Sequence, residues 1–208
     1  MSPGAGGPGL RVGLTGGLAA GKSTVAGLLA EQGLIVFDAD RLVAELYGPG
    51  QPGAERVREL FGDSMLGRDG AVDRGALAAT VFRDPGALAR LEAAIHPLVR
   101  DRFEEIAGDV GIVVVEATRL VEAGWGDELD LVVTVEAPAE LRLERAVARG
   151  MDRDEARRRL AAQGEGEARR RRADVVMVND GDLAALRAAV AVLVRDLRRR
   201  LVDKEVRG

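Results

Sequence analysis

The sequence contains no cysteine and only one histidine, His96. Without cysteine, the chain forms no disulfide, no thiolate metal site and no cysteine nucleophile. A single histidine also excludes a metal site built from a cluster of histidines. Proteins that depend on disulfides, on cysteine as a nucleophile or metal ligand, or on a cluster of metal-binding histidines are therefore excluded.

Lysine is almost absent as well. The 30 basic residues include two lysines, Lys22 and Lys204, so that 28 are arginines. A codon bias toward GC-rich triplets explains this composition. Under such a bias, a lysine that is retained in the body of the chain indicates a specific role for that residue. Lys22 meets that description, whereas Lys204 lies in the polar C-terminal tail, where we expect no special role.

The chain also lacks the features of a nucleic-acid or membrane protein. The formal net charge is −4 and aromatic residues make up 3% of the 208 residues. A basic surface would favour binding to nucleic acid or anionic lipid, and no apolar run approaches the roughly 20 residues of a membrane span. Residues 1–9 do not resemble a secretory signal and are expected to form a flexible leader. We expect a soluble cytoplasmic protein with no nucleic-acid or membrane partner; the oligomeric state stays open.

Short apolar runs alternate with helical patterns along the remaining residues. This alternation is typical of a parallel sheet with helices on both faces, in a doubly wound α/β fold. We expect residues 10–208 to form a single domain, with a helical insertion at about 54–105 over the carboxyl edge of the sheet. The five predicted strands are Leu10–Leu14, Leu34–Phe37, Ile112–Val115, Leu131–Val135 and Val175–Val178.

A phosphate-binding motif follows the first predicted strand. Residues Gly16 to Ser23 match the pattern G-x4-G-K-[ST], and a helical pattern comes next. Glycines permit backbone angles that turn the loop amides inward, where they cradle phosphate oxygens. Lys22 can reach the β- and γ-phosphates, and Ser23 can ligate Mg²⁺. The motif predicts an ATP site formed by Gly17, Ala19, Ala20, Gly21, Lys22, Ser23 and Thr24, with Ser23 as the metal ligand.

The motifs of switch GTPases are absent, and the small size favours a small-molecule kinase. Such a kinase needs an acid near the acceptor hydroxyl and a lid that carries cations. Asp38 and Asp40 follow the second predicted strand, and either can accept a proton, hold Mg²⁺ through water or cap a helix. Arg145, Arg149 and Arg159 fall where lids lie, at about residues 145–170. Arg169–Arg172 reads as a charged helix surface rather than a nucleic-acid patch.

These residues resemble the dephospho-coenzyme A kinases over about residues 11–195. The resemblance rests on an ordered set of motifs whose spacing fits that family. They are GLTGG at 13–17 with GKST at 21–24, DAD at 38–40, VF at 81–82, LE-x-x-x-HP at 91–97, AD at 173–174 and N-x-G at 179–181.

The resemblance implies ATP-dependent phosphorylation of the ribose 3′-hydroxyl of dephospho-CoA, the last step of coenzyme A synthesis. It implies Mg²⁺ as cofactor and ATP and dephospho-CoA as the small-molecule substrates. His96 matches a histidine on the substrate side, although a His-Pro pair is ordinarily a helix start or a packing feature. The implied catalytic residues are Lys22, Arg145 and Asp40, which acts as the base. Arg149 and Asn179 are implied to contact ATP, and Arg159 and Gln163 to lie in the lid. The residues implied at the acceptor are Asp38, Asp40, His96, Arg100, Leu120 and Glu122.

One segment departs from the family pattern. Where the family has a sequence like D-I-P-L-L-F-E, residues 116–122 read EATRLVE, so that the proline is lost and Arg119 replaces an apolar residue. Arg119 contacts a substrate phosphate or points to solvent. Two alternatives therefore stay open: another P-loop small-molecule kinase, acting on a nucleotide or a sugar, and a non-catalytic ATP-binding regulator.

Overall fold

The chain divides into two compact units. The computed structural model describes residues 9–108, 111–121, 124–163 and 166–207. The first unit is formed by residues 1–37 and 109–208, and the second by residues 38–108. The second unit is one continuous segment of the sequence, and it is wider than the helical insertion predicted at about 54–105.

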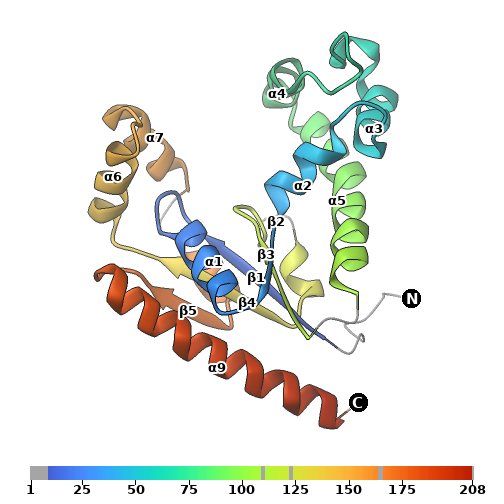
Figure 1. The fold of residues 1–208 in the computed structure, drawn as a ribbon. Helices are drawn as coiled ribbons and strands as arrows, with labels where there is room; N and C mark the ends of the chain where they lie inside the picture. The colour runs from blue at the N-terminus through green and yellow to red at the C-terminus, as the bar shows by residue number, and fades with distance from the viewer. Residues whose placement is uncertain (1–8, 109–110, 122–123, 164–165, 208) are drawn as a thin grey trace. The chain divides into compact units, whose positions relative to one another are not determined.

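A five-stranded sheet forms the centre of the first unit (Figure 1). The strand order is β2-β3-β1-β4-β5, and the registers of β1 with β3, β1 with β4 and β4 with β5 are all parallel. The prediction of a five-stranded, doubly wound α/β fold is confirmed. The strands are β1 (Leu10–Gly16), β2 (Ile35–Asp38), β3 (Ile112–Glu116), β4 (Leu131–Glu136) and β5 (Val175–Val178).

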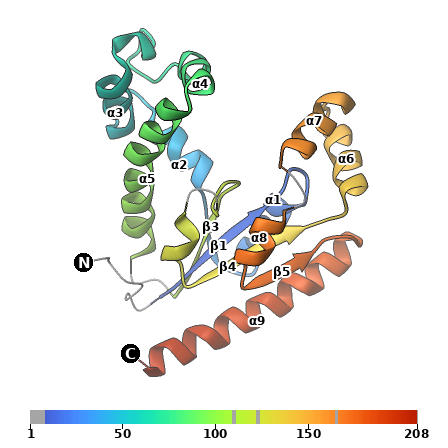
Figure 2. The same ribbon diagram turned by 180° about the vertical axis from the view of Figure 1, so that it is seen from behind.

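Helices cover both faces of this sheet. On one face, α1 (Lys22–Glu31) and α9 (Leu183–Arg207) pack on alternate strand residues such as Val12 and Val133. The other face carries α8 (Glu167–Arg172), which lies in front of β4 and β5 in Figure 2. Burial of both faces explains why β1, β3 and β4 read as continuous apolar runs, whereas the edge strands β2 and β5 are partly exposed. The remaining elements of this unit are the short helix η2 (Trp125–Glu128), α6 (Ala139–Ala148) and α7 (Arg153–Gln163).

Two aspartates fix where neighbouring strands begin to pair. Asp130, just before β4, accepts the Arg11 amide at 2.7 Å through Oδ2 and donates its own amide to the Arg11 carbonyl at 2.9 Å. Asp174, just before β5, does the same with Val132, at 2.7 and 2.8 Å. Each carboxylate thus replaces a backbone carbonyl and satisfies the amide of the second residue of the adjacent strand. This is the structural role of Asp174 in the AD motif at 173–174.

Lys204 is bound rather than free in a polar tail. Its Nζ donates to the Gly9 carbonyl at 2.8 Å and to both oxygens of Asp130 at 2.8 and 2.9 Å. The expectation of no special role is therefore wrong, because Lys204 ties the end of α9 to the starts of β1 and β4. Helix α9 ends at Arg207, six residues beyond the predicted end at Leu201.

The second unit consists of helices (Figure 1). Asp73 and Asp84 cap α4 and α5 by accepting amides of their first turns. Helix α5 continues through Pro97, so the His96–Pro97 pair lies in its interior and does not start a helix. The elements are α2 (Ala39–Leu46), α3 (Pro52–Phe61), the short helix η1 (Asp63–Met65), α4 (Arg74–Arg83) and α5 (Pro85–Ala107). None of the helices in the described ranges is both long and apolar enough to span a membrane.

Candidate active site

The phosphate loop connects β1 to α1, as the motif predicts. β1 ends at Gly16 and α1 begins at Lys22. Gly21 has φ +105°, and a Cβ at this position would lie 2.1 Å from Nδ2 of Asn179. Both the backbone angle and the close neighbour therefore require glycine. Ala19 also has a positive φ of 57°, which is uncommon for a residue with a side chain.

Lys22 and Ser23 share one carboxylate oxygen. Lys22 Nζ lies 2.6 Å and Ser23 Oγ 2.8 Å from Oε1 of Glu116, the last residue of β3. The side chains of Lys22 and Glu116 are 13% and 9% exposed, so this ion pair is weakly screened by water. The two groups predicted to bind phosphate and metal therefore meet at a carboxylate supplied by the adjacent strand.

Asn179 supports the loop from the end of β5. Its side chain is buried and donates through Nδ2 to the Ala20 carbonyl at 2.8 Å. Arg145 donates to the Asn179 carbonyl at 3.0 Å. The structure thus places Arg145 beside Asn179, and Asn179 against the phosphate loop. Their contacts with ATP remain predictions.

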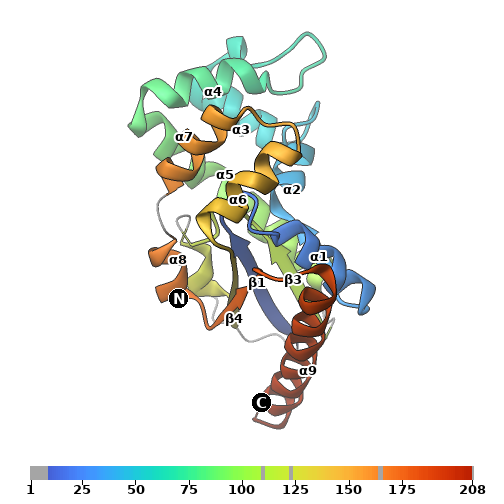
Figure 3. The ribbon, with the colours of Figure 1, turned by 90° about the vertical axis from the view of Figure 1, so that its left-hand side faces the viewer.

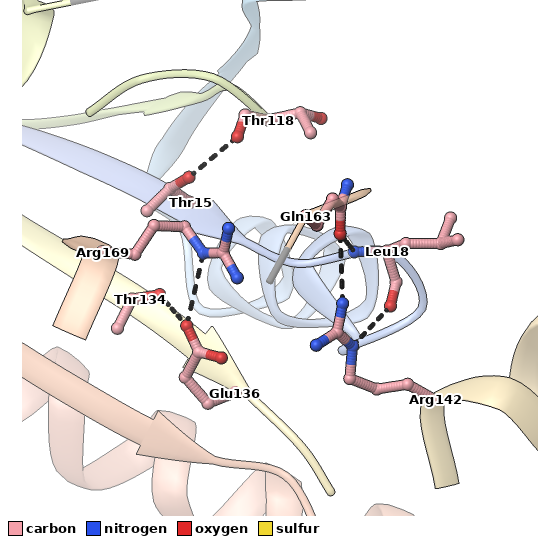
Figure 4. Close-up of polar contacts among 8 residues, drawn as sticks. All are labelled: Thr15, Leu18, Thr118, Thr134, Glu136, Arg142, Gln163 and Arg169. Carbon is pink, nitrogen blue, oxygen red and sulfur yellow. Dashed lines mark hydrogen bonds and ion pairs between the residues drawn. The ribbon is translucent and has the colours of Figure 1, made fainter. Parts of the chain in front are cut away.

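Two buried arginines lie against the start of the loop. Arg142 of α6 is 5% exposed and Arg169 of α8 is 4% exposed. A Cβ on Gly17 would lie 2.5 Å from Nη2 of Arg142 and 3.1 Å from Nη2 of Arg169. Arg169 Nε lies 3.5 Å from Oε1 of Glu136, which also accepts from Thr134 (Figure 4). The prediction of a charged helix surface at 169–172 is therefore wrong for Arg169, although Arg170–Arg172 are exposed.

The pKa of the Arg142 guanidinium is lowered. Burial is the main cause, the charge of Arg169 adds to it, and the charge of Glu136 opposes it. In the described part of the chain, no carboxylate lies within ion-pair distance of Arg142. Arg142 therefore places a buried positive charge beside Gly17 that no carboxylate among the described residues pairs directly.

Helices α6 and α7 lie side by side and pack directly on the phosphate loop (Figures 1 and 3). Leu18 and Ala19 of the loop join an apolar cluster with Leu143, Ala146 and Ala156 of these helices. Gln163, at the end of α7, accepts the Leu18 amide at 2.8 Å. Among the predicted lid arginines, Arg159 forms an exposed ion pair with Glu155, and Arg149 lines a pocket beside Leu18 and Ala19.

The residues predicted on the acceptor side belong mostly to the second unit. Asp38 caps α2 by accepting the amides of Asp40 and Arg41 at 2.9 and 3.2 Å. Because one aspartate of the pair is enough to cap the helix, Asp40 remains as the candidate base; its side chain is exposed in the first turn of α2. His96 and Arg100 are half-buried on α5.

The atypical segment after β3 divides into two parts. Ala117 continues the pairing by donating its amide to Leu14, and Thr118 accepts from Thr15 Oγ1 at 3.3 Å. Arg119 is exposed, whereas Leu120 is 1% exposed and lies beside Gly13 and Gly126. Leu120 thus packs in the core of the first unit, and its contact with an acceptor stays a prediction. Glu122, also predicted at the acceptor, lies outside the described residues.

The sequence places Glu116 only in the atypical segment 116–122, without its contacts to Lys22 and Ser23, and it gives no role to Arg142 or Glu136. Glu116 and Glu136 end β3 and β4, the two strands that flank β1. Acidic residues at the carboxyl ends of strands next to a phosphate loop are a signal that could have identified both. Arg142 precedes Arg145 by three residues on α6, so helical spacing alone places both on one face.

The first strand of the sheet leads into the phosphate loop, and helices that carry arginines pack on this loop. These features define a P-loop kinase that acts on small molecules. Residues 10–185 match the family model described as dephospho-CoA kinase. The chain belongs to this family.

Known relatives agree with this assignment. A dephospho-CoA kinase of Moorella thermoacetica is 45% identical over 92% of this chain and 94% of its own length. A solved structure from Thermus thermophilus is 39% identical, with a TM-score of 0.76 and coverage of 90% of this chain and 97% of that one. The solved dephospho-CoA kinase of Campylobacter jejuni is 22% identical, with a TM-score of 0.67 and coverage of 91% and 97%, and shares the fold.

Proposed function

We propose that this protein transfers the γ-phosphoryl group of ATP to the ribose 3′-hydroxyl of dephospho-CoA and so forms coenzyme A. The observation that carries this proposal is membership of the dephospho-CoA kinase family over residues 10–185, together with an intact phosphate loop. Consistent with this role, we place the enzyme in the cytoplasm.

The phosphate loop supplies the positive charge that the reaction needs. Lys22 neutralises charge that develops on the transferring phosphoryl group, and its flexible stem lets the ammonium group follow the phosphate. Arg145, held by the Asn179 carbonyl, is proposed as a second cation for the same group. Arg149 and Asn179 are proposed to contact ATP, and Arg159 and Gln163 to belong to the lid.

Asp40 is proposed as the general base. It would accept the proton of the 3′-hydroxyl as that oxygen bonds to phosphorus and the bond to the ADP oxygen breaks. Asp38 is occupied as the cap of α2, which leaves this role to Asp40. Asp38, His96, Arg100, Leu120 and Glu122 stay proposals for the acceptor site.

The loop also fits a magnesium ion. Ser23 Oγ and the Glu116 carboxylate are oxygen donors 2.8 Å apart, and oxygen is the ligand that Mg²⁺ prefers. Within the described ranges no group of three or more acidic, histidine or cysteine side chains is positioned to hold a metal ion. Mg²⁺ would then take most of its ligands from ATP and water, as is usual for phosphoryl transfer, and would neutralise phosphate charge when bound.

An ADP-release assay with a panel of acceptors tests this proposal. We expect turnover with dephospho-CoA, and much slower turnover with nucleotides or sugars. Faster turnover with one of the other acceptors would favour a different P-loop small-molecule kinase. If folded protein binds ATP but releases ADP with none of them, the non-catalytic regulator becomes the better account.

A further inference from the structure

Two side chains and the backbone of one residue form a closed set of hydrogen bonds at the start of the phosphate loop (Figure 4). Leu18 donates its amide to Gln163 Oε1 at 2.8 Å and accepts Arg142 Nε at its carbonyl at 2.9 Å. Arg142 closes the ring by donating through Nη2 to the same Gln163 oxygen at 3.1 Å. Both backbone polar groups of Leu18 are thus bound by side chains of α6 and α7.

The surroundings hold this ring in place. Arg142 is 5% exposed, and its guanidinium occupies the space that a side chain at residue 17 would fill. On the other side, Leu18 and Ala19 pack in the apolar cluster formed with α6 and α7. A shift of α7 would break hydrogen bonds to the loop and also disturb this packing. The position of α7 and the conformation of the loop are therefore coupled.

We propose that Arg142 is a positioning residue that couples the lid helix α7 to the phosphate loop through Leu18 and Gln163, and thereby sets the affinity for ATP. Binding is tighter when a loop is already held in its bound conformation, because less conformational entropy is lost. The inference rests on the proposed function only in treating ATP as the substrate.

Variants at both ends of the ring test this coupling. We would measure the Kd of a non-hydrolysable ATP analogue by calorimetry, and KM for ATP and kcat in the ADP-release assay. For Arg142→Ala and for Gln163→Ala we expect Kd and KM to rise about tenfold, as for the loss of a charge-assisted hydrogen bond, with a much smaller fall in kcat. The double variant should be no weaker than either single variant, since the ring is already open.

Conservative and matched control variants separate coupling from general stability. Gln163→Glu keeps an oxygen that can accept from both Leu18 and Arg142, and its affinity should stay within about threefold of wild type. Arg142→Lys keeps the charge but cannot place two donors in fixed directions, so it should resemble Arg142→Ala. Arg157→Ala, on the exposed face of α7, should leave the Kd unchanged.

Additive effects in the double variant, or an unchanged Kd in Gln163→Ala, would overturn the proposal. If Arg142→Ala does not fold, the two Gln163 variants still decide the question. The proposed function is tested independently of this coupling, because ATP binding can be measured without an acceptor. A chain that shows the coupling but does not phosphorylate dephospho-CoA would refute only the function, and one that phosphorylates dephospho-CoA without the coupling would refute only this inference.

Discussion

At the scale of single residues, the two lysines have different roles but make the same kind of contact. Each places a compact ammonium group among oxygen atoms: Lys22 binds Glu116 at 2.6 Å, and Lys204 binds Asp130 and the Gly9 carbonyl at 2.8 to 2.9 Å. Arginine has a wide planar fork that fits such narrow sites poorly. Both lysines of an arginine-rich chain thus lie where an ammonium group fits best.

Lys22→Arg should lower kcat/KM by at least ~100-fold, although it conserves the charge. This corresponds to about 2.7 kcal/mol of transition-state stabilisation. The guanidinium is too wide to take the place of Nζ beside Glu116 and the loop. Steady-state kinetics with ATP and dephospho-CoA measure the effect, and Lys204→Arg is the matched control for a lysine away from the loop. Near-normal activity of Lys22→Arg would mean that the shape of the cation does not matter there.

At the scale of helices and strands, the sequence predicts what depends on local pattern. Continuous apolar runs predict all five strands. In β1, β3 and β4 the runs show no alternation because both faces are buried, whereas the edge strands β2 and β5 are partly exposed. The burial of Arg169 could not be predicted, since one buried arginine among four in a six-residue helix leaves no periodic signal. The contacts of Lys204 could not be predicted either, because Asp130 and Gly9 are 74 and 195 residues away in the sequence.

The link between α9 and the sheet gives a test of stability. Lys204→Ala removes the bonds to Asp130 and Gly9 and should lower the free energy of unfolding by about 1–2 kcal/mol. The side chain is 27% exposed, which keeps the loss well below that of a fully buried pair. Urea denaturation measures the change, with Glu205→Ala, one residue on and exposed, as control. Equal unfolding midpoints for the two variants would show that the link contributes nothing.

At the scale of the whole molecule, the two units divide the candidate residues. The phosphate loop, Arg142, Arg145, Arg149 and Asn179 belong to the first unit, and Asp40, His96 and Arg100 to the second. The sequence predicts where the phosphate loop lies, between β1 and α1, because glycine, lysine and serine at fixed spacing form a local pattern. The partners of the loop come from strands and helices distant in sequence, so only the fold brings them to it.

This division predicts separate footprints for the two substrates in hydrogen exchange. A non-hydrolysable ATP analogue alone should slow exchange at residues 16–24 and in α7, because its binding orders the loop and the lid. Dephospho-CoA alone should slow exchange in α2 and the middle of α5, which carry Asp40 and His96. Mass spectrometry of peptic peptides reads out both. Protection by dephospho-CoA confined to the first unit would contradict the assignment of Asp40, His96 and Arg100 to the acceptor.

The proposed reaction is phosphorylation of the 3′-hydroxyl of dephospho-CoA with Asp40 as the base. The most direct measurement incubates ATP, Mg²⁺ and dephospho-CoA with wild-type protein and with Asp40→Asn, and identifies the product by mass spectrometry and ³¹P NMR. We predict 3′-phosphorylated coenzyme A with wild type, and a rate at least ~100-fold lower with Asp40→Asn at unchanged ATP affinity. Product formed equally fast by Asp40→Asn, or phosphate at another position, would contradict the account.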